Sequence, residues 1–169
     1  MNYTRHDLIQ VEATMNQMRN TIYHLARYMK KNGVTDINDR LRRMGQNMGR
    51  TIYNYWKAVE LVTLSNVKDV ITTIYQKILS SSVTTEINER EQKITTTDYK
   101  CAVCKYKYED INVSGCQIII GMVSELVNQI SKASNNSSRI YLEPLNVKES
   151  KALGHKACII EYRYKVGGS

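Results

Sequence analysis

The sequence predicts a mixed α/β (α+β) domain, because the hydrophobic period changes from helical to alternating, and back again, along one chain. The 169 residues contain no internal repeat and no low-complexity tract, so we expect a single domain over residues 1–169. The segments with helical spacing are 8–29, 37–59, 67–78 and 116–130, and the alternating ones are 83–108, 139–145 and 157–166.

The first helix is predicted from a narrow apolar seam with alternating spacings of three and four. Lys30, Lys31 and Gly33 supply the charge and the stop expected at its C-terminus. A seam this narrow needs another helix against it. We expect that helix to come from a second copy or a related subunit, and the alternative is that the seam packs inside one protomer. The seam is formed by Leu8, Val11, Met15, Met18, Ile22, Leu25 and Met29.

The second helix carries two glycines one turn apart, Gly45 and Gly49, beside its apolar face. Each glycine costs a helix roughly 0.5–1 kcal/mol relative to alanine. Close approach of another helix backbone would offset that cost, and the alternative is that the cost is simply tolerated. The dimer interface predicted from the two helices comprises Met15, Met18, Ile22, Leu25, Met29, Met44, Gly45, Met48, Gly49 and Ile52.

The remaining elements follow from local signals. Asn66 begins a third helix, and Ser80 to Ser82 end it. The alternating region 83–108 has a polar break at 88–93, as expected for a hairpin. The segment 116–130 is apolar on a broad stripe, which indicates a central buried helix. Two alternating strands close the chain.

The formal charge of +8 favours an acidic partner, such as nucleic acid, an anionic membrane surface or an acidic protein. A basic surface that only serves solubility is the alternative, because the 24 Lys and Arg residues are spread along the chain. Neither a signal peptide nor an apolar run of about 20 residues is present. We therefore expect a soluble, cytoplasmic protein with reduced cysteines.

The sequence gives no positive sign of catalysis or of a cofactor. Cys101 and Cys104 form a C-x-x-C pair, but zinc needs four ligands and no second pair follows. In a strand, residues three apart point to opposite faces, so we expect no metal site. The histidines His6, His24 and His155 lack nucleophile or carboxylate patterns. Lysines and tyrosines interleave over 99–108 without a nucleic-acid-binding signature, so no nucleic acid is expected.

The stretch "DRLRRMGQNMGRTIYNYW" resembles the second helix of the small subunits of the TRAPP tethering particle. The matching positions are Leu41, Met44, Gly45, Asn47 and Gly49. "GCQIIIGMVSELV" resembles a later helix of the same family, and the likeness extends over residues 18–166. It implies helices packed on a small antiparallel sheet, and a non-enzymatic scaffold that pairs through its N-terminal helices. It also implies a complex that activates Rab-type GTPases and tethers vesicles at ER and Golgi membranes.

Two departures accompany this resemblance. Some family members carry a fatty acyl chain on a cysteine just before the third helix, where this chain has Leu64, Ser65 and Asn66, so we expect no acylation. The stretch "ALGHKACIIEYRY" also resembles the end of the 4-vinyl-reductase domain, which shares the fold. The alternative function is therefore a ligand-sensing domain that binds a small apolar molecule.

Overall fold

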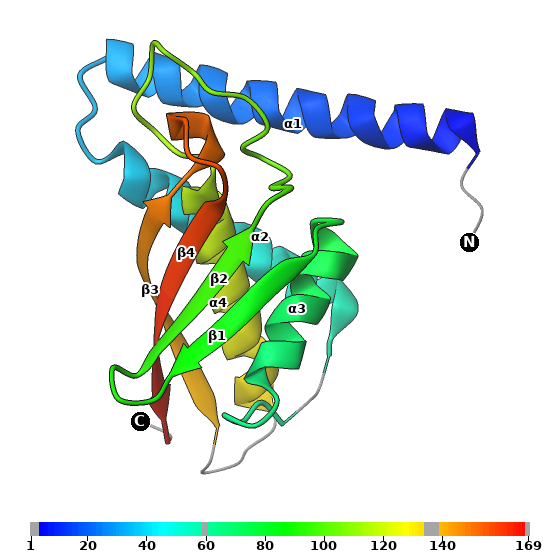
Figure 1. The fold of residues 1–169 in the computed structure, drawn as a ribbon, viewed down its shortest axis with the longest axis vertical. Helices are drawn as coiled ribbons and strands as arrows, with labels where there is room; N and C mark the ends of the chain where they lie inside the picture. The colour runs from blue at the N-terminus through cyan, green and yellow to red at the C-terminus, as the bar shows by residue number, and fades with distance from the viewer. Residues whose placement is uncertain (1–3, 59–60, 134–138, 168–169) are drawn as a thin grey trace.

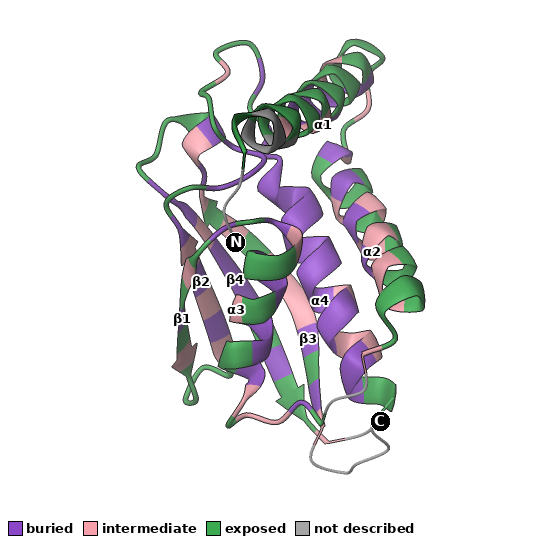
Figure 2. Ribbon diagram, turned by 90° about the vertical axis from the view of Figure 1, so that its right-hand side faces the viewer, coloured by how far each residue is buried: buried purple, intermediate pink, exposed green. Residues whose placement is uncertain are grey.

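The chain folds into three layers: an antiparallel sheet, a middle layer of two helices and one outer helix (Figures 1 and 2). The computed structural model describes residues 4–58, 61–133 and 139–167, without the side chains of 6–8 and 11. Its elements are α1 (Arg5–Lys31), α2 (Ile37–Trp56), α3 (Val67–Ile78), β1 (Val83–Asn88), β2 (Lys93–Asp98), α4 (Cys116–Ala133), β3 (Ile140–Glu149), the 3-10 turn η1 (Lys151–Leu153) and β4 (Cys158–Val166).

The four strands form one sheet in the order β1-β2-β4-β3, and all three pairs are antiparallel. The predicted fold class, with helices packed on a small antiparallel sheet, is confirmed. The β1–β2 hairpin has its break where it was predicted. The alternating region ends earlier than expected, however, because β2 stops at Asp98. Residues 99–115 form an irregular loop, which we call the cysteine loop.

Helix α4 lies in the middle layer between the sheet and α2 (Figure 2). Apolar groups therefore surround it, and its side chains from Cys116 to Ser124 are all buried. This explains why its sequence is apolar on nearly every face rather than on one stripe. Helix α3 lies beside it in the same layer.

The two glycines of α2 pack against α4 of the same chain. A Cβ added to Gly45 would lie 2.0 Å from the carbonyl oxygen of Ile118, and one added to Gly49 would lie 2.7 Å from that of Met122. The approach is reciprocal, because a Cβ on Gly121 of α4 would lie 2.1 Å from the carbonyl oxygen of Arg42. Close helix packing, the first of the two interpretations of these glycines, is the one the structure shows.

Helix α1 lies across one end of the layers, and its N-terminal part projects beyond the body of the molecule (Figure 1). The seam residues Ile22 and Met29 are buried within this chain, whereas Leu25 keeps 37% of its surface exposed. The side chains of Leu8 and Val11, and residue Val59 at the end of the second predicted helix (37–59), lie outside the described residues.

Candidate functional site

The cysteine loop is the main support of α1. Arg19 of α1 is buried and donates to the carbonyl oxygen of Ala102 at 2.9 Å. The Tyr23 hydroxyl accepts a hydrogen bond from the Gly115 amide at 3.1 Å. Its ring stacks on that of Tyr108, with 4.0 Å between centroids.

Further along α1, Arg27 forms two hydrogen bonds with the Asp110 carboxylate, and Lys30 donates to the Asp110 backbone carbonyl. The guanidinium of Arg27 also lies over the Tyr108 ring. The position of α1 therefore depends on the conformation of the cysteine loop.

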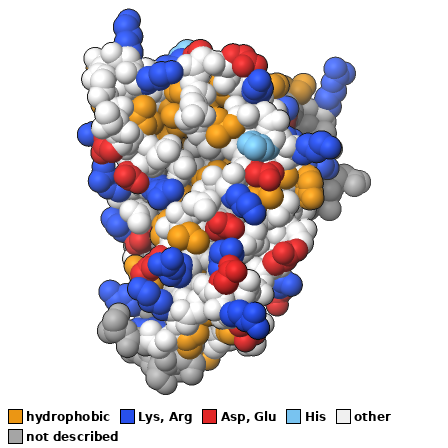
Figure 3. Space-filling view, turned by 60° about the vertical axis from the view of Figure 1, so that its left-hand side comes forward, with side chains coloured by type: hydrophobic (Ala, Val, Ile, Leu, Met, Phe, Trp, Pro, Cys, Tyr) orange, Lys and Arg blue, Asp and Glu red, His pale blue; other side chains and the backbone are white. Residues whose placement is uncertain are grey.

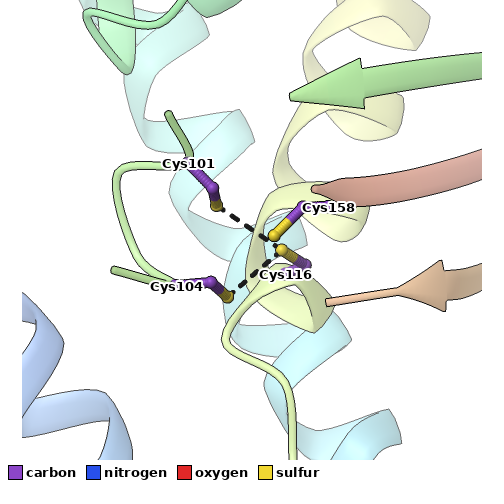
Figure 4. A group of neighbouring side chains, drawn as sticks. All are labelled: Cys101, Cys104, Cys116 and Cys158. Atoms are coloured by element: carbon purple, nitrogen blue, oxygen red, sulfur yellow. Dashed lines mark hydrogen bonds between the residues drawn. The ribbon is translucent and has the colours of Figure 1, made fainter. Parts of the chain in front are cut away.

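All four cysteines of the chain converge beneath this loop (Figure 4). Cys101 and Cys104 come from the loop, Cys116 is the first residue of α4, and Cys158 is the first residue of β4. Their sulfur atoms lie within 4.8 Å of one another, and all four residues are buried. The Sγ–Sγ distances are 3.3 Å between Cys104 and Cys116 and 3.6 Å between Cys101 and Cys116.

Polar groups surround the sulfurs on several sides. The Lys151 amide donates to Cys158 Sγ at 3.4 Å, and the Tyr23 hydroxyl lies 3.4 Å from Cys104 Sγ. The Ser114 hydroxyl lies 3.7 Å from Cys104 Sγ and accepts from the Cys116 amide, which begins α4. These groups can stabilise negative charge on sulfur.

The pKa values of three thiols, those of Cys101, Cys104 and Cys116, are shifted in different directions. Burial by itself raises the pKa of Cys104, but hydrogen bonds from the neighbouring thiols outweigh burial and hold that pKa well below its usual value. Hydrogen bonding to Cys104 raises the pKa of Cys101, and hydrogen bonding to Cys101 and Cys104 raises that of Cys116. The lowered pKa of Cys104 favours its thiolate over those of Cys101 and Cys116, and the thiolate is the form of cysteine that binds metal ions.

The expectation that Cys101 and Cys104 lack partners is wrong. It assumed a strand through both residues, but the pair lies in the loop after β2, where both sulfurs can turn the same way. Cys116 and Cys158, which stood alone in apolar stripes of the sequence, are the missing partners. Only the C-x-x-C spacing signalled the cluster, because the partners are 12 and 54 residues from Cys104 along the chain.

A cleft beside the cluster connects it to the surface under α1. It has a volume of about 410 Å³, and Cys101 forms part of its wall. Lys100, Lys105 and Lys151 also line it, as does Arg19, whose Nε has no hydrogen-bond partner. Glu12 also lines the cleft and forms ion pairs with Arg19 and Lys105, so the basic side chains outnumber the acidic one.

The residues of the predicted dimer interface divide into two groups. Ile22, Met29, Gly45 and Gly49 are buried inside the chain. The others remain at least partly exposed, and those of α2 form a stripe beside its buried face. This exposed group consists of Met15, Met18 and Leu25 on α1 and Met44, Met48 and Ile52 on α2.

Where α2 ends, an open apolar groove separates it from α3. The groove has a volume of about 550 Å³, and Ile52, Tyr55, Trp56 and Ile78 are among its lining residues. Tyr55 and Trp56 are 87% and 44% exposed, so this surface continues the stripe of α2.

Comparison with solved structures identifies the fold. The chain superposes on a trafficking protein particle complex subunit 3 from Naegleria fowleri, solved with covalently bound palmitic acid, with a TM-score of 0.63. The match covers 94% of this chain and 99% of that one, at 15% sequence identity. This chain has the fold of that TRAPP subunit.

A second structure shares much of the same fold. It is the phenol-responsive sensory domain of the transcription activator PoxR, solved with phenol, at a TM-score of 0.51 and 12% identity. The match covers 85% of this chain and 73% of that one. No family model matches the sequence, and no curated protein matches it.

Two further observations bear on membranes. No described helix is both long enough and apolar enough to cross a bilayer. The turn before α3, where acylated TRAPP relatives were expected to carry a cysteine, contains Leu64, Ser65 and Asn66, and Asn66 is held by hydrogen bonds to Leu61 and Thr63. Ser65 is exposed there.

Proposed function

We propose that this protein is a non-enzymatic scaffold subunit of a TRAPP-like complex that tethers vesicles and activates a Rab-type small GTPase. The observation that carries the proposal is the likeness to a TRAPP subunit over nearly the full length of both chains. Its partners are a second copy or related small subunits, and the GTPase is contacted only through the assembled complex.

The surface proposed for pairing is the partly exposed stripe Met44, Met48 and Ile52 of α2, together with Leu25 of α1. Apolar side chains in a continuous stripe at a surface are typical of protein–protein contacts. Methionine suits such a contact because its flexible side chain adapts to the partner.

We propose that the protein is cytoplasmic and touches membranes only at their periphery. On the face shown in Figure 3, Lys and Arg side chains are interspersed with Asp and Glu and are not gathered into one patch. Contact with an anionic ER or Golgi surface would then be weak and sensitive to salt.

The pairing surface is tested by replacing Met48 and Ile52 with lysine in one chain. Both side chains pack against the rim of the core but are partly exposed, so a lysine can lay its stem on the core and extend its ammonium into water, and the fold should survive. We expect light scattering to show a dimer for the wild type and a monomer with an unchanged circular dichroism spectrum for the variant. If the wild type pairs only with a related subunit, that subunit should copurify with the wild type from its own cells and not with the lysine variant.

The matched control replaces Thr51 and Asn54, which are exposed on the same helix, with lysine. This control should pair as the wild type does. A folded wild-type monomer that also recovers no related subunit from its own cells would contradict the proposal.

We also propose that this chain carries no covalently bound fatty acid, whereas the Naegleria fowleri subunit was solved with covalently bound palmitic acid. The reason is that a thioester needs a cysteine, and all four cysteines are buried in the cluster. Intact-mass measurement of protein from its own cells should show no added acyl mass. A palmitoyl increment would contradict this.

The second candidate function is a sensory domain for a small apolar molecule. It is favoured by the fold shared with the PoxR domain and by the apolar groove between α2 and α3. Native mass spectrometry separates the two functions, because a copurifying small molecule would support the sensor and a bare assembly would support the scaffold.

A further inference from the structure

We propose that Cys101, Cys104, Cys116 and Cys158 bind one Zn²⁺ ion in a tetrahedral, structural site.

The spacing of the sulfurs fits a single ion. Zinc–thiolate bonds of about 2.3 Å place the ligands of a tetrahedral site roughly 3.8 Å apart. The Sγ–Sγ distances of 3.3 Å and 3.6 Å, and the upper limit of 4.8 Å for the whole set, lie on both sides of that value. A disulfide requires a sulfur–sulfur bond of about 2.05 Å, and all four cysteines are free.

The same distances distinguish a site for a single metal ion from a site for an iron–sulfur cluster with several metal ions. An iron–sulfur cluster inserts two or more irons and inorganic sulfides between its cysteines, and sulfurs within 4.8 Å of one another leave room for one atom only. Four thiolates around one ion also leave no position for water or substrate. Such a closed site is typical of structural zinc.

The surroundings suit the charge that the site would carry. When Zn²⁺ replaces the protons of four thiols, four protons are released and a net charge of minus two remains. Cys116 lies at the N-terminus of α4, where the helix dipole favours negative charge. The Lys151 amide donates to Cys158, and the Arg19 guanidinium, with its unpartnered Nε, lies along the cleft beside Cys101.

The site would join three separate parts of the chain. The cysteine loop contributes two ligands, α4 one and β4 one. Residues 99–115 contain no helix or strand, so they have no regular backbone hydrogen bonds to hold them in place. A bound ion would stabilise their conformation instead. The ion would thereby fix the surface on which α1 lies, through Arg19 and Tyr23.

The first experiment measures metal in the wild-type protein purified without chelators. Elemental analysis should find one zinc per chain, and a thiol-specific mercurial should release that zinc as the four thiols react. Reconstitution of the metal-free chain with Co²⁺ should give the thiolate-to-metal charge-transfer band and the intense visible bands of a tetrahedral sulfur site.

The second experiment uses single ligand variants and a matched control. Cys104→Ser and Cys158→Ser each remove one of the four sulfur ligands, and each should lose the zinc that the wild type retains through purification. Val103→Ala disturbs the same buried loop without removing a sulfur, and it should keep one zinc per chain.

A ligand variant that fails to fold does not leave the proposal untested, because the wild type provides a separate measurement. Removal of zinc by a chelator should speed hydrogen exchange across residues 99–115 and α1, and re-addition of zinc should reverse it. A wild-type chain that contains no zinc and gives no cobalt–thiolate band would overturn the proposal. One iron per chain would overturn the choice of zinc.

Discussion

At the scale of single residues, Gly45 shows how local propensity and packing can favour opposite outcomes. An alanine in an open helix position would gain roughly 0.5–1 kcal/mol over glycine. At Gly45 the added methyl group would lie 2.0 Å from a backbone carbonyl oxygen of α4, which cannot move as a side-chain tip can. Packing therefore decides whether an alanine at this position stabilises or destabilises the fold.

We expect Gly45→Ala to lower the free energy of unfolding by at least roughly 2 kcal/mol, as overpacked cores do. Gly121→Ala should do the same from the other helix, because its Cβ would meet Arg42. Urea denaturation measures both. Thr51→Ala, on an exposed position of α2, is the control and should change stability little. A gain in stability for Gly45→Ala would contradict the close approach.

Asp110 gives a prediction on pH. The hydrogen bonds from Arg27 lower its pKa below the usual value, with a smaller contribution from the charge of Lys30. A carboxylate with a lowered folded-state pKa stabilises the fold above its unfolded pKa of about 3.9, and this contribution is lost as pH falls through the folded value. The stability difference between wild type and Asp110→Asn should therefore be present at pH 7 and shrink as the pH falls below 4. A difference that grows on acidification would contradict this pairing.

At the scale of elements, α1 depends on a loop rather than on another helix. Tyr23 is fully buried, stacks on Tyr108 and accepts from the Gly115 amide. Tyr28 lies on the same helix and is 67% exposed. Substituting each tyrosine in turn therefore separates the effect of the loop contacts from the effect of changing a residue within the helix.

Tyr23→Ala should lower the free energy of unfolding by about 3–5 kcal/mol, the usual cost of deleting a buried aromatic ring. Tyr28→Ala should change it by less than about 0.5 kcal/mol. Hydrogen exchange should show α1 opening in the first variant only. Equal effects of the two substitutions would mean that the loop does not hold α1.

The cysteine loop also marks the limit of what the sequence predicts. Helices and strands were found because their apolar residues recur at a fixed period, and the bounds of α4, β1 and β4 follow closely from it. The alternation of apolar and polar residues continues by chance past Asp98, so the pattern predicts a strand through Cys101 and Cys104 that the structure does not contain. The convergence of four cysteines from separate elements is a property of the tertiary fold, which no local period contains.

The interface prediction met a similar limit. A helical seam shows which residues are buried but not whether the covering helix belongs to the same chain. For Ile22 and Gly45 it is this chain that covers them. For Met48 and Ile52 the covering partner stays a prediction.

At the scale of the whole molecule, the charge of +8 predicts how the protein meets membranes. Each Lys or Arg near an anionic surface contributes about 1 kcal/mol, and salt screens this attraction. We expect binding to vesicles that contain phosphatidylserine at low salt and none at high salt, measured by co-sedimentation. Vesicles of phosphatidylcholine alone are the control. Binding that survives high salt would indicate an apolar anchor.

The crossing of α2 and α4 has a consequence for motion. Packed helices in many proteins slide past one another by small shear steps, because their side chains can exchange rotamers as they move. Here the two backbones approach closely at Gly45, which lies against the backbone of α4, and at Gly121, which lies against the backbone of α2. Translation along either axis would drive a carbonyl oxygen into a neighbouring side chain. We therefore expect the two helices to move as one rigid body.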